Sequence, residues 1–94
     1  VLVCSRDGLD EVSLSAPTMV RVVQEDEYDT REWRPEEFGL GGVSLESIKA
    51  DGPAASAAVI RRVLADEDGP ARRIVLANAA AALWAAEAVP TLRE

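Results

Sequence analysis

Three carboxylates stand close together near the start of the chain. Asp7, Asp10 and Glu11 occur in the run DGLDE, directly after an apolar segment typical of a buried strand. Ligands of α/β proteins tend to bind at the carboxyl ends of such strands. Adjacent carboxylates in a loop can hold Mg²⁺ together with waters and phosphate oxygens, and a metal ion there would neutralise a pyrophosphate leaving group. Surface acids are usually solvated, however, and in a chain with 17 Asp and Glu residues a neighbouring pair also arises by chance.

The remaining side chains offer fewer kinds of chemistry. The chain has no histidine, which excludes Ser–His–Asp triads, histidine general bases and histidine-ligated metals. The single cysteine, Cys4, excludes an internal disulfide and a cysteine-built zinc site, and within its apolar segment it is predicted to be a small buried hydrophobe. Asn78 lies in an alanine-rich segment, where we expect it to bond a neighbouring backbone. Arg72 and Arg73 are expected at the surface rather than in a substrate clamp.

Strands are predicted around the carboxylates. The β-branched run at residues 1–4 indicates a fully buried strand. The valines of 18–23 and the aromatic and threonine content of 28–33 indicate an antiparallel hairpin around the solvated acidic tip 24–27. Pro35 ends this hairpin because proline lacks the N–H that a strand donates to its neighbour.

Irregular segments connect these strands to the rest of the chain. Residues 9–17 form a polar connection that is interrupted by Val12 and Leu14. Residues 35–40 predict one helical turn, with proline at its start, acids near its positive end and glycine at its close. Residues 44–49 are either another short turn or an extended piece.

The C-terminal half predicts two helices. The first covers residues 54–66 and carries four large apolar residues at helical spacing on one face: Val59, Ile60, Val63 and Leu64. Gly69 is expected to close this helix and Pro70 to open the next one. The second helix, over 71–88, is apolar most of the way round, which is typical of a helix buried in a larger body. A further helix is expected to begin within 90–94.

The fold class that follows is α+β: a short strand, a β-hairpin and two main C-terminal helices. With 94 residues we expect a single partial domain over 1–94. Its strand and hairpin region covers 1–34, its short turns 35–50 and its helical region 51–94. Because the chain begins with Val1 rather than methionine, we expect it to be a piece of something longer.

The net charge of the chain argues against some classes of binding partner. A net charge of −7 argues against nucleic acid and against anionic membranes, since both need a basic surface. No apolar run approaches the roughly 20 residues of a membrane span, and no export signal is visible. We therefore expect a cytoplasmic protein.

The order of these motifs resembles the C-terminal part of the anthranilate phosphoribosyltransferase family, in the nucleoside phosphorylase and phosphoribosyltransferase superfamily. The residues that carry the resemblance are Asp7 to Ser13 after the strand, Ala16-Pro17-Thr18, Pro35 to Leu40, Gly69 to Leu76 and Asn78 to Leu83. Any one of these motifs is weak, but together they cover nearly the whole chain in the order and approximate spacing of the family.

This resemblance implies an α/β phosphoribosyltransferase domain and a magnesium-dependent reaction of tryptophan biosynthesis. Phosphoribose would move from phosphoribosyl pyrophosphate to the amine of anthranilate, with Asp10 and Glu11 as the residues that bind Mg²⁺. Cys4-Ser5 stands where the family usually has His-Gly. The family's glycine-rich phosphate loop, lysine-containing loop and N-terminal helical domain precede this region, so the isolated chain is expected to be inactive.

Two other interpretations stay open. The chain could be a non-catalytic α+β module, because apolar surface left exposed usually finds a partner; we expect self-association or pairing with a missing parental segment. A fragment of a related pyrimidine nucleoside phosphorylase is the other, although residues 35–40 and the alanine-rich helix fit that relative less well.

Overall fold

The computed structural model describes residues 1–93 and contains a three-stranded antiparallel sheet with two helices. Strands β1 (Leu2–Ser5), β2 (Thr18–Gln24) and β3 (Glu27–Trp33) lie in the order β1-β2-β3. The predicted hairpin is confirmed, with Thr18 opposite Trp33 and Gln24 opposite Glu27. β1 adds to the other edge of β2, with Leu2 opposite Arg21.

The sheet is covered on one face only. In β1, Val3 is half-buried and Ser5 is buried, whereas Leu2 is 65% exposed and Cys4 is exposed as well. The predictions of a fully buried first strand and of a buried Cys4 are therefore wrong. Successive side chains of a strand point to opposite faces, and within residues 1–93 no helix or strand packs over the face that carries Leu2 and Cys4.

Two short 3₁₀ helices follow the sheet. η1 (Pro35–Phe38) begins at the predicted proline and ends at Gly39, whose φ of 69° is a left-handed conformation that glycine adopts readily. The helical turn predicted here is confirmed. The second, η2 (Leu45–Ile48), shows that residues 44–49 contain a short helical turn and are not an extended piece, the two alternatives that the sequence left open.

Both predicted helices are present but end earlier than expected. α1 covers Pro53–Leu64 and α2 covers Pro70–Ala85. Each is closed by an acidic residue with positive φ, Asp66 at 61° and Glu87 at 59°, and the N–H that follows bonds back into the last turn. Gly69 precedes α2 rather than closing α1, which corrects the prediction, while Pro70 opens α2 as expected.

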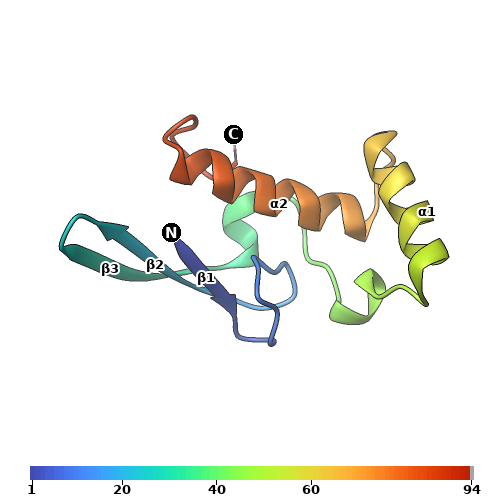
Figure 1. The fold of residues 1–94 in the computed structure, drawn as a ribbon, viewed down its shortest axis with the longest axis horizontal. Helices are drawn as coiled ribbons and strands as arrows, with labels where there is room; N and C mark the ends of the chain where they lie inside the picture. The colour runs from blue at the N-terminus through green and yellow to red at the C-terminus, as the bar shows by residue number, and fades with distance from the viewer. Residues whose placement is uncertain (94) are drawn as a thin grey trace.

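The core lies between α2 and the covered face of the sheet (Figure 1). α2 contributes Ile74, Ala77 and Ala81, and the sheet contributes Val20 and Trp33. The Trp33 ring meets the rings of two neighbours edge to face, with centroids 6.0 Å from Phe38 and 5.4 Å from Trp84. The small alanines let α2 approach the sheet closely.

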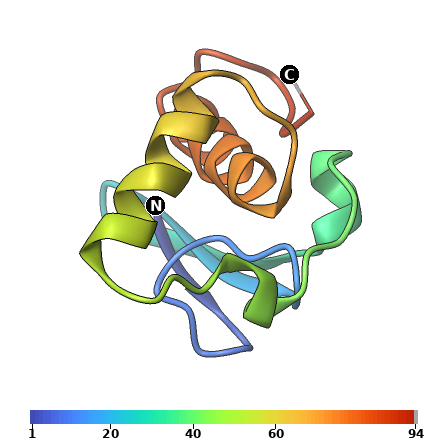
Figure 2. The same cartoon turned by 90° about the vertical axis from the view of Figure 1, so that its right-hand side faces the viewer.

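α1 lies beside the start of α2 and away from the sheet, as Figures 1 and 2 show. None of its residues is buried, and Leu64 is 82% exposed. The four apolar residues predicted to share a face are thus divided between half-buried Val59 and Val63 and exposed Ile60 and Leu64.

The last described residues form bends and turns rather than the start of a helix, which corrects the prediction for 90–93; Glu94 lies outside the described residues. Among residues 1–93, no helix combines the length and the hydropathy that crossing a membrane requires.

Candidate functional site

The candidate carboxylates lie in the loop that joins β1 to β2, which runs beneath the middle of α2 (Figures 1 and 2). Asp10 and Glu11 are both exposed. Within residues 1–93 neither carboxylate accepts a hydrogen bond or forms an ion pair, so all their oxygens are available to a ligand. The loop is hereafter called the carboxylate loop and comprises residues 6–17.

Unlike Asp10 and Glu11, Asp7 already accepts hydrogen bonds from within the loop. Its carboxylate accepts hydrogen bonds from the hydroxyl of Ser13 at 2.6 Å, from the hydroxyl of Ser15, and from the Leu9 N–H at 3.2 Å. Burial alone would raise the pKa of Asp7, but these hydrogen bonds outweigh it and hold the pKa well below its usual range. Asp7 therefore organises the loop and has few lone pairs left for a metal ion.

The second half of the carboxylate loop is anchored in the core. Val12 and Leu14, at 0% and 1% exposure, are among the most buried side chains of the molecule. The Ser13 N–H donates to Thr18 Oγ1 at 3.2 Å, and the Leu14 carbonyl accepts from the Val43 N–H at 3.1 Å. A segment expected to be a polar connection is consequently a packed part of the structure.

Asn78 ties the same loop to α2. Its Oδ1 accepts from the Val12 N–H at 2.9 Å, and its Nδ2 donates to the Val12 carbonyl at 3.0 Å. Nδ2 also donates to the carbonyl of Ile74, one turn earlier in α2, at 3.0 Å. The prediction that Asn78 bonds a neighbouring backbone is confirmed, and the backbone in question adjoins Glu11.

The carboxylates available suit a magnesium site that is completed by substrate phosphates and waters better than a site made of protein ligands alone. No group of three or more Asp, Glu or Cys side chains in residues 1–93 is placed to hold a metal ion. Mg²⁺ usually takes only one or two protein carboxylates and completes its shell with waters and substrate phosphates. Asp10 and Glu11, exposed and free of internal partners, fit that requirement.

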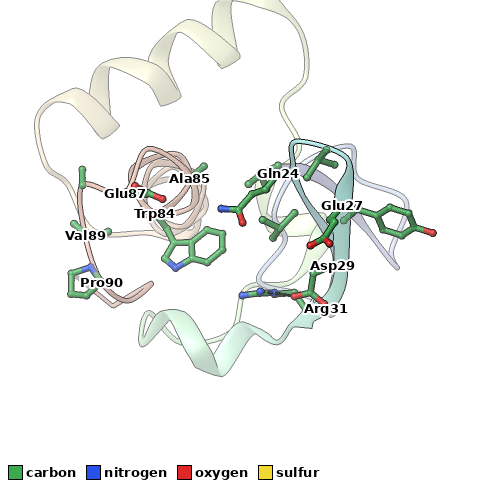
Figure 3. A pocket seen from close by; sticks show the side chains of 14 residues that line it. Gln24, Glu27, Asp29, Arg31, Trp84, Ala85, Glu87, Val89 and Pro90 are labelled. Carbon is green, nitrogen blue, oxygen red and sulfur yellow. Dashed lines mark hydrogen bonds and ion pairs between the residues drawn. The ribbon is translucent and has the colours of Figure 1, made fainter.

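A cleft of about 950 Å³ lies elsewhere, between the β2–β3 hairpin and the end of α2. Figure 3 shows Trp84 of α2 and Arg31 of β3 extending toward each other across it, and the Arg31 guanidinium lies 5.4 Å from the Trp84 ring centroid. Its lining contains no residue of the carboxylate loop. The cation–π contact joins α2 to the hairpin.

The two arginines at the start of α2 form ion pairs with carboxylates of the preceding turn. Arg72 pairs with Asp66 at 2.8 Å, and Arg73 pairs with Asp68 at 3.4 Å. The hydrogen bond from Arg73 lowers the pKa of Asp68. Both arginines thus pair within the α1–α2 connection, and both are half-buried rather than fully at the surface as expected.

Comparison with known proteins assigns the family. All 94 residues match the sequence model described as the α/β domain of a glycosyl transferase family, so the chain belongs to that family. Anthranilate phosphoribosyltransferase of Thioalkalivibrio sulfidiphilus is 45% identical over 87 residues, which is 93% of this chain and 26% of that protein. The enzyme of the same name from Symbiobacterium thermophilum is 43% identical over the full chain and 28% of its own length. The chain thus spans about a quarter of the curated relatives it matches.

Solved structures share the fold. Anthranilate phosphoribosyltransferase from Thermus thermophilus superposes with a TM-score of 0.79 at 36% identity, over 97% of this chain and 26% of that one. The Saccharomyces cerevisiae enzyme in complex with 4-fluoroanthranilate gives a TM-score of 0.81 at 24% identity, and a variant of it with Mg bound gives 0.79. Residues 1–93 therefore have the α+β fold of the matching part of these anthranilate phosphoribosyltransferase structures.

Sequence reasoning found the carboxylate pair but missed the residues that hold its loop. No role was assigned from the sequence to Ser13 or Ser15, whose hydroxyls bond Asp7, and Ser13 is as buried as its neighbours Val12 and Leu14. Asp7 was grouped with the other acids because spacing alone does not distinguish a carboxylate bound by hydroxyls from a free one.

Proposed function

We propose that this chain is the C-terminal part of a Mg²⁺-dependent transferase that moves phosphoribose from phosphoribosyl pyrophosphate to the amine of anthranilate, in the cytoplasm, as a step of tryptophan biosynthesis. The observation that carries the proposal is the match of the chain over its whole length to anthranilate phosphoribosyltransferases at 39–45% identity. In the reaction the amine nitrogen forms a bond to the anomeric carbon of ribose. The bond from that carbon to pyrophosphate breaks, pyrophosphate leaves with the electron pair, and the amine loses a proton.

Asp10 and Glu11 are the proposed metal-binding residues. When bound, Mg²⁺ would neutralise negative charge on the pyrophosphate group. The two side chains would present carboxylate oxygens at an exposed point in the middle of the carboxylate loop, where the ion can be shared with substrate phosphate. The free state of both carboxylates supports this role, in contrast to Asp7, which is bound by hydroxyls.

We further propose that the 94 residues form a single partial domain that is inactive alone. A pyrophosphate needs hydrogen-bond donors around it and the anthranilate acceptor needs a pocket, whereas the side chains of Asp10 and Glu11 supply acceptor oxygens only. A turnover assay with both substrates and Mg²⁺ is expected to give no product from the isolated chain. Measurable turnover would refute this part of the proposal.

The metal role is tested by NMR titration of the chain with Mg²⁺, with and without pyrophosphate. We expect shifts at the amides of Asp10 and Glu11 that grow when pyrophosphate is present. The double change Asp10→Asn with Glu11→Gln should abolish them. The chain offers a matched control in Asp26 and Glu27, the same two residue types side by side and exposed at the tip of the hairpin. Equal responses from the two pairs would mean that the carboxylate pair is an ordinary solvated one.

A second proposed property is self-association, or pairing with the rest of a longer protein. It is favoured by the exposure of large apolar side chains on both helices, among them Ile60, Leu64, Val75 and Leu83. Contiguous exposed apolar surface usually marks an interaction site. Sedimentation at high concentration is the test, and a purely monomeric chain would exclude self-association.

A further inference from the structure

The carboxylate loop is held from outside at one point close to the proposed metal-binding residues. That point is Val12, which follows Glu11 directly and is fully buried. Its N–H and its carbonyl both bond the side-chain amide of Asn78, at 2.9 and 3.0 Å, from a helix 66 residues further along the chain. The two hydrogen bonds hold the two peptide units on either side of the Val12 Cα, and so they fix the backbone orientation at Val12 as well as its position.

The amide of Asn78 is itself fixed. Its second N–H donates to the carbonyl of Ile74, at 3.0 Å, and Ile74 is part of the core. Both N–H groups and the oxygen of the amide are therefore used, which is the full donor capacity of an asparagine. An amide held in this way by its own helix transmits the position of α2 to the loop.

On the other side of the carboxylate pair, Asp7 holds the loop from within. It receives the Leu9 N–H and the hydroxyl of Ser13, so it bridges the residues before and after the pair. Asp10 and Glu11 stand between these two attachments, and within residues 1–93 their side chains form no hydrogen bond or ion pair that would orient them. Their direction depends on the attachments.

We propose that Asn78 is a positioning residue for the carboxylate pair: its amide holds the backbone of Val12 and thereby sets the direction in which Asp10 and Glu11 leave the loop. This inference rests on the proposed function for its metal-binding part. Groups that orient metal ligands without touching the metal typically contribute 10- to 100-fold in metal affinity. The position of Asn78 would thus make α2 part of the metal site although none of its residues is a proposed ligand.

The test uses the 94-residue chain and the changes Asn78→Ala and Asn78→Asp. The first removes all three hydrogen bonds. The second keeps an acceptor for the Val12 N–H but removes both donors, so it tests the inference even if the alanine variant does not fold. The control is Ala82→Gly, at an exposed position of the same helix that takes no part in the hydrogen bonds to the loop. This change lowers helix stability but leaves the Asn78 amide in place.

Three quantities are compared: hydrogen exchange of the Val12 amide, backbone NMR order parameters at Asp10 and Glu11, and the apparent affinity for Mg²⁺ in the presence of pyrophosphate. In Asn78→Ala we expect exchange at Val12 to rise about tenfold or more, the order parameters to fall, and the affinity to fall about tenfold. The aspartate variant should lie between alanine and the unchanged chain. The control should keep all three quantities near those of the unchanged chain.

The inference is overturned if both Asn78 variants leave the order of Asp10 and Glu11 as it is in the control. It is also overturned if affinity falls equally in the control, because lost stability would then explain the effect. Failure of the proposed function gives a different result: the unchanged chain does not respond to Mg²⁺ and pyrophosphate at all. The comparison of Val12 exchange and loop order would still decide whether Asn78 holds the loop.

Discussion

The carboxylate loop and α1 differ in a way that their local structures do not suggest. The loop has no regular secondary structure, yet it contains Val12 and Leu14 at 0% and 1% exposure and is bound to α2 through Asn78. α1 is a regular helix of 12 residues, and none of them is buried. The difference shows that regular backbone hydrogen bonding and contribution to the core are separate properties. The changes below test whether stability follows burial rather than regularity.

The largest contrast is expected from proline in the two helices. Ala79→Pro in the middle of α2 removes a backbone hydrogen bond and should lower the free energy of unfolding by at least about 3 kcal/mol, because the core depends on that helix. Ala58→Pro in α1 has the same local effect but should change the global value by less than about 1 kcal/mol, since α1 can open without exposing the core. Urea denaturation followed by tryptophan fluorescence measures both. Equal losses would show that α1 is an integral part of the folding unit.

A side-chain truncation should separate the two regions next. Leu14→Ala removes a fully buried side chain and should lower the free energy of unfolding by about 2–5 kcal/mol. Leu64→Ala, in α1, removes the same atoms from a side chain that is 82% exposed and should cost less than about 0.5 kcal/mol. Thermal denaturation of the two variants compares them directly. A large effect at Leu64 would mean that α1 is covered in solution.

Within the carboxylate loop, Asp7→Asn should lower the free energy of unfolding by about 1–3 kcal/mol, because the hydroxyls of Ser13 and Ser15 lose a charged acceptor. The effect has a defined pH dependence. The pKa of Asp7 is lower in the folded chain than the unfolded value of about 3.9, so its contribution is complete above about pH 4 and is lost as the pH falls further. Denaturation at several pH values should therefore show a steeper acid loss in the unchanged chain than in the variant. Parallel curves would contradict the role assigned to Asp7.

The smallest effect on stability is expected at the exposed surface of α1. Ile60→Ser combined with Leu64→Ser should change the free energy of unfolding by less than about 0.5 kcal/mol. If α1 provides the surface for self-association, the same change should shift the sedimentation profile toward monomer. Val23→Ser, at another half-exposed apolar position, is the control and should leave association unchanged. Association that is equally strong in the double variant would place the contact surface elsewhere.

Much of the fold could be read from local patterns. The hairpin, the turn at η1 and both helices were predicted, since strand propensity, proline at a helix start and helical spacing act over a few residues. The helix ends were less well predicted, because Asp66 adopts the left-handed conformation that Gly69 was expected to supply and Glu87 does the same after α2. The exposure of Cys4 was missed because nothing in its own segment states which face of the sheet is covered.

At the candidate site, too, some features follow from local sequence and others only from the packing of distant segments. The placement of Asp10 and Glu11 in a loop after a strand follows from the sequence alone, because an apolar run followed by Asp-Gly is a local signal. That Asp7 is bound by two serines and that Asn78 reaches Val12 follows only from the packing of distant segments.

The sequence by itself determined which segments become strands and helices and where two adjacent carboxylates meet solvent, because those properties depend on neighbours a few residues away. Only the tertiary structure decided which apolar faces are covered, which acid is taken up by hydroxyls and which helix holds the loop. Contacts between residues as far as 66 positions apart form when α2 packs on the sheet, and no short-range pattern encodes their geometry.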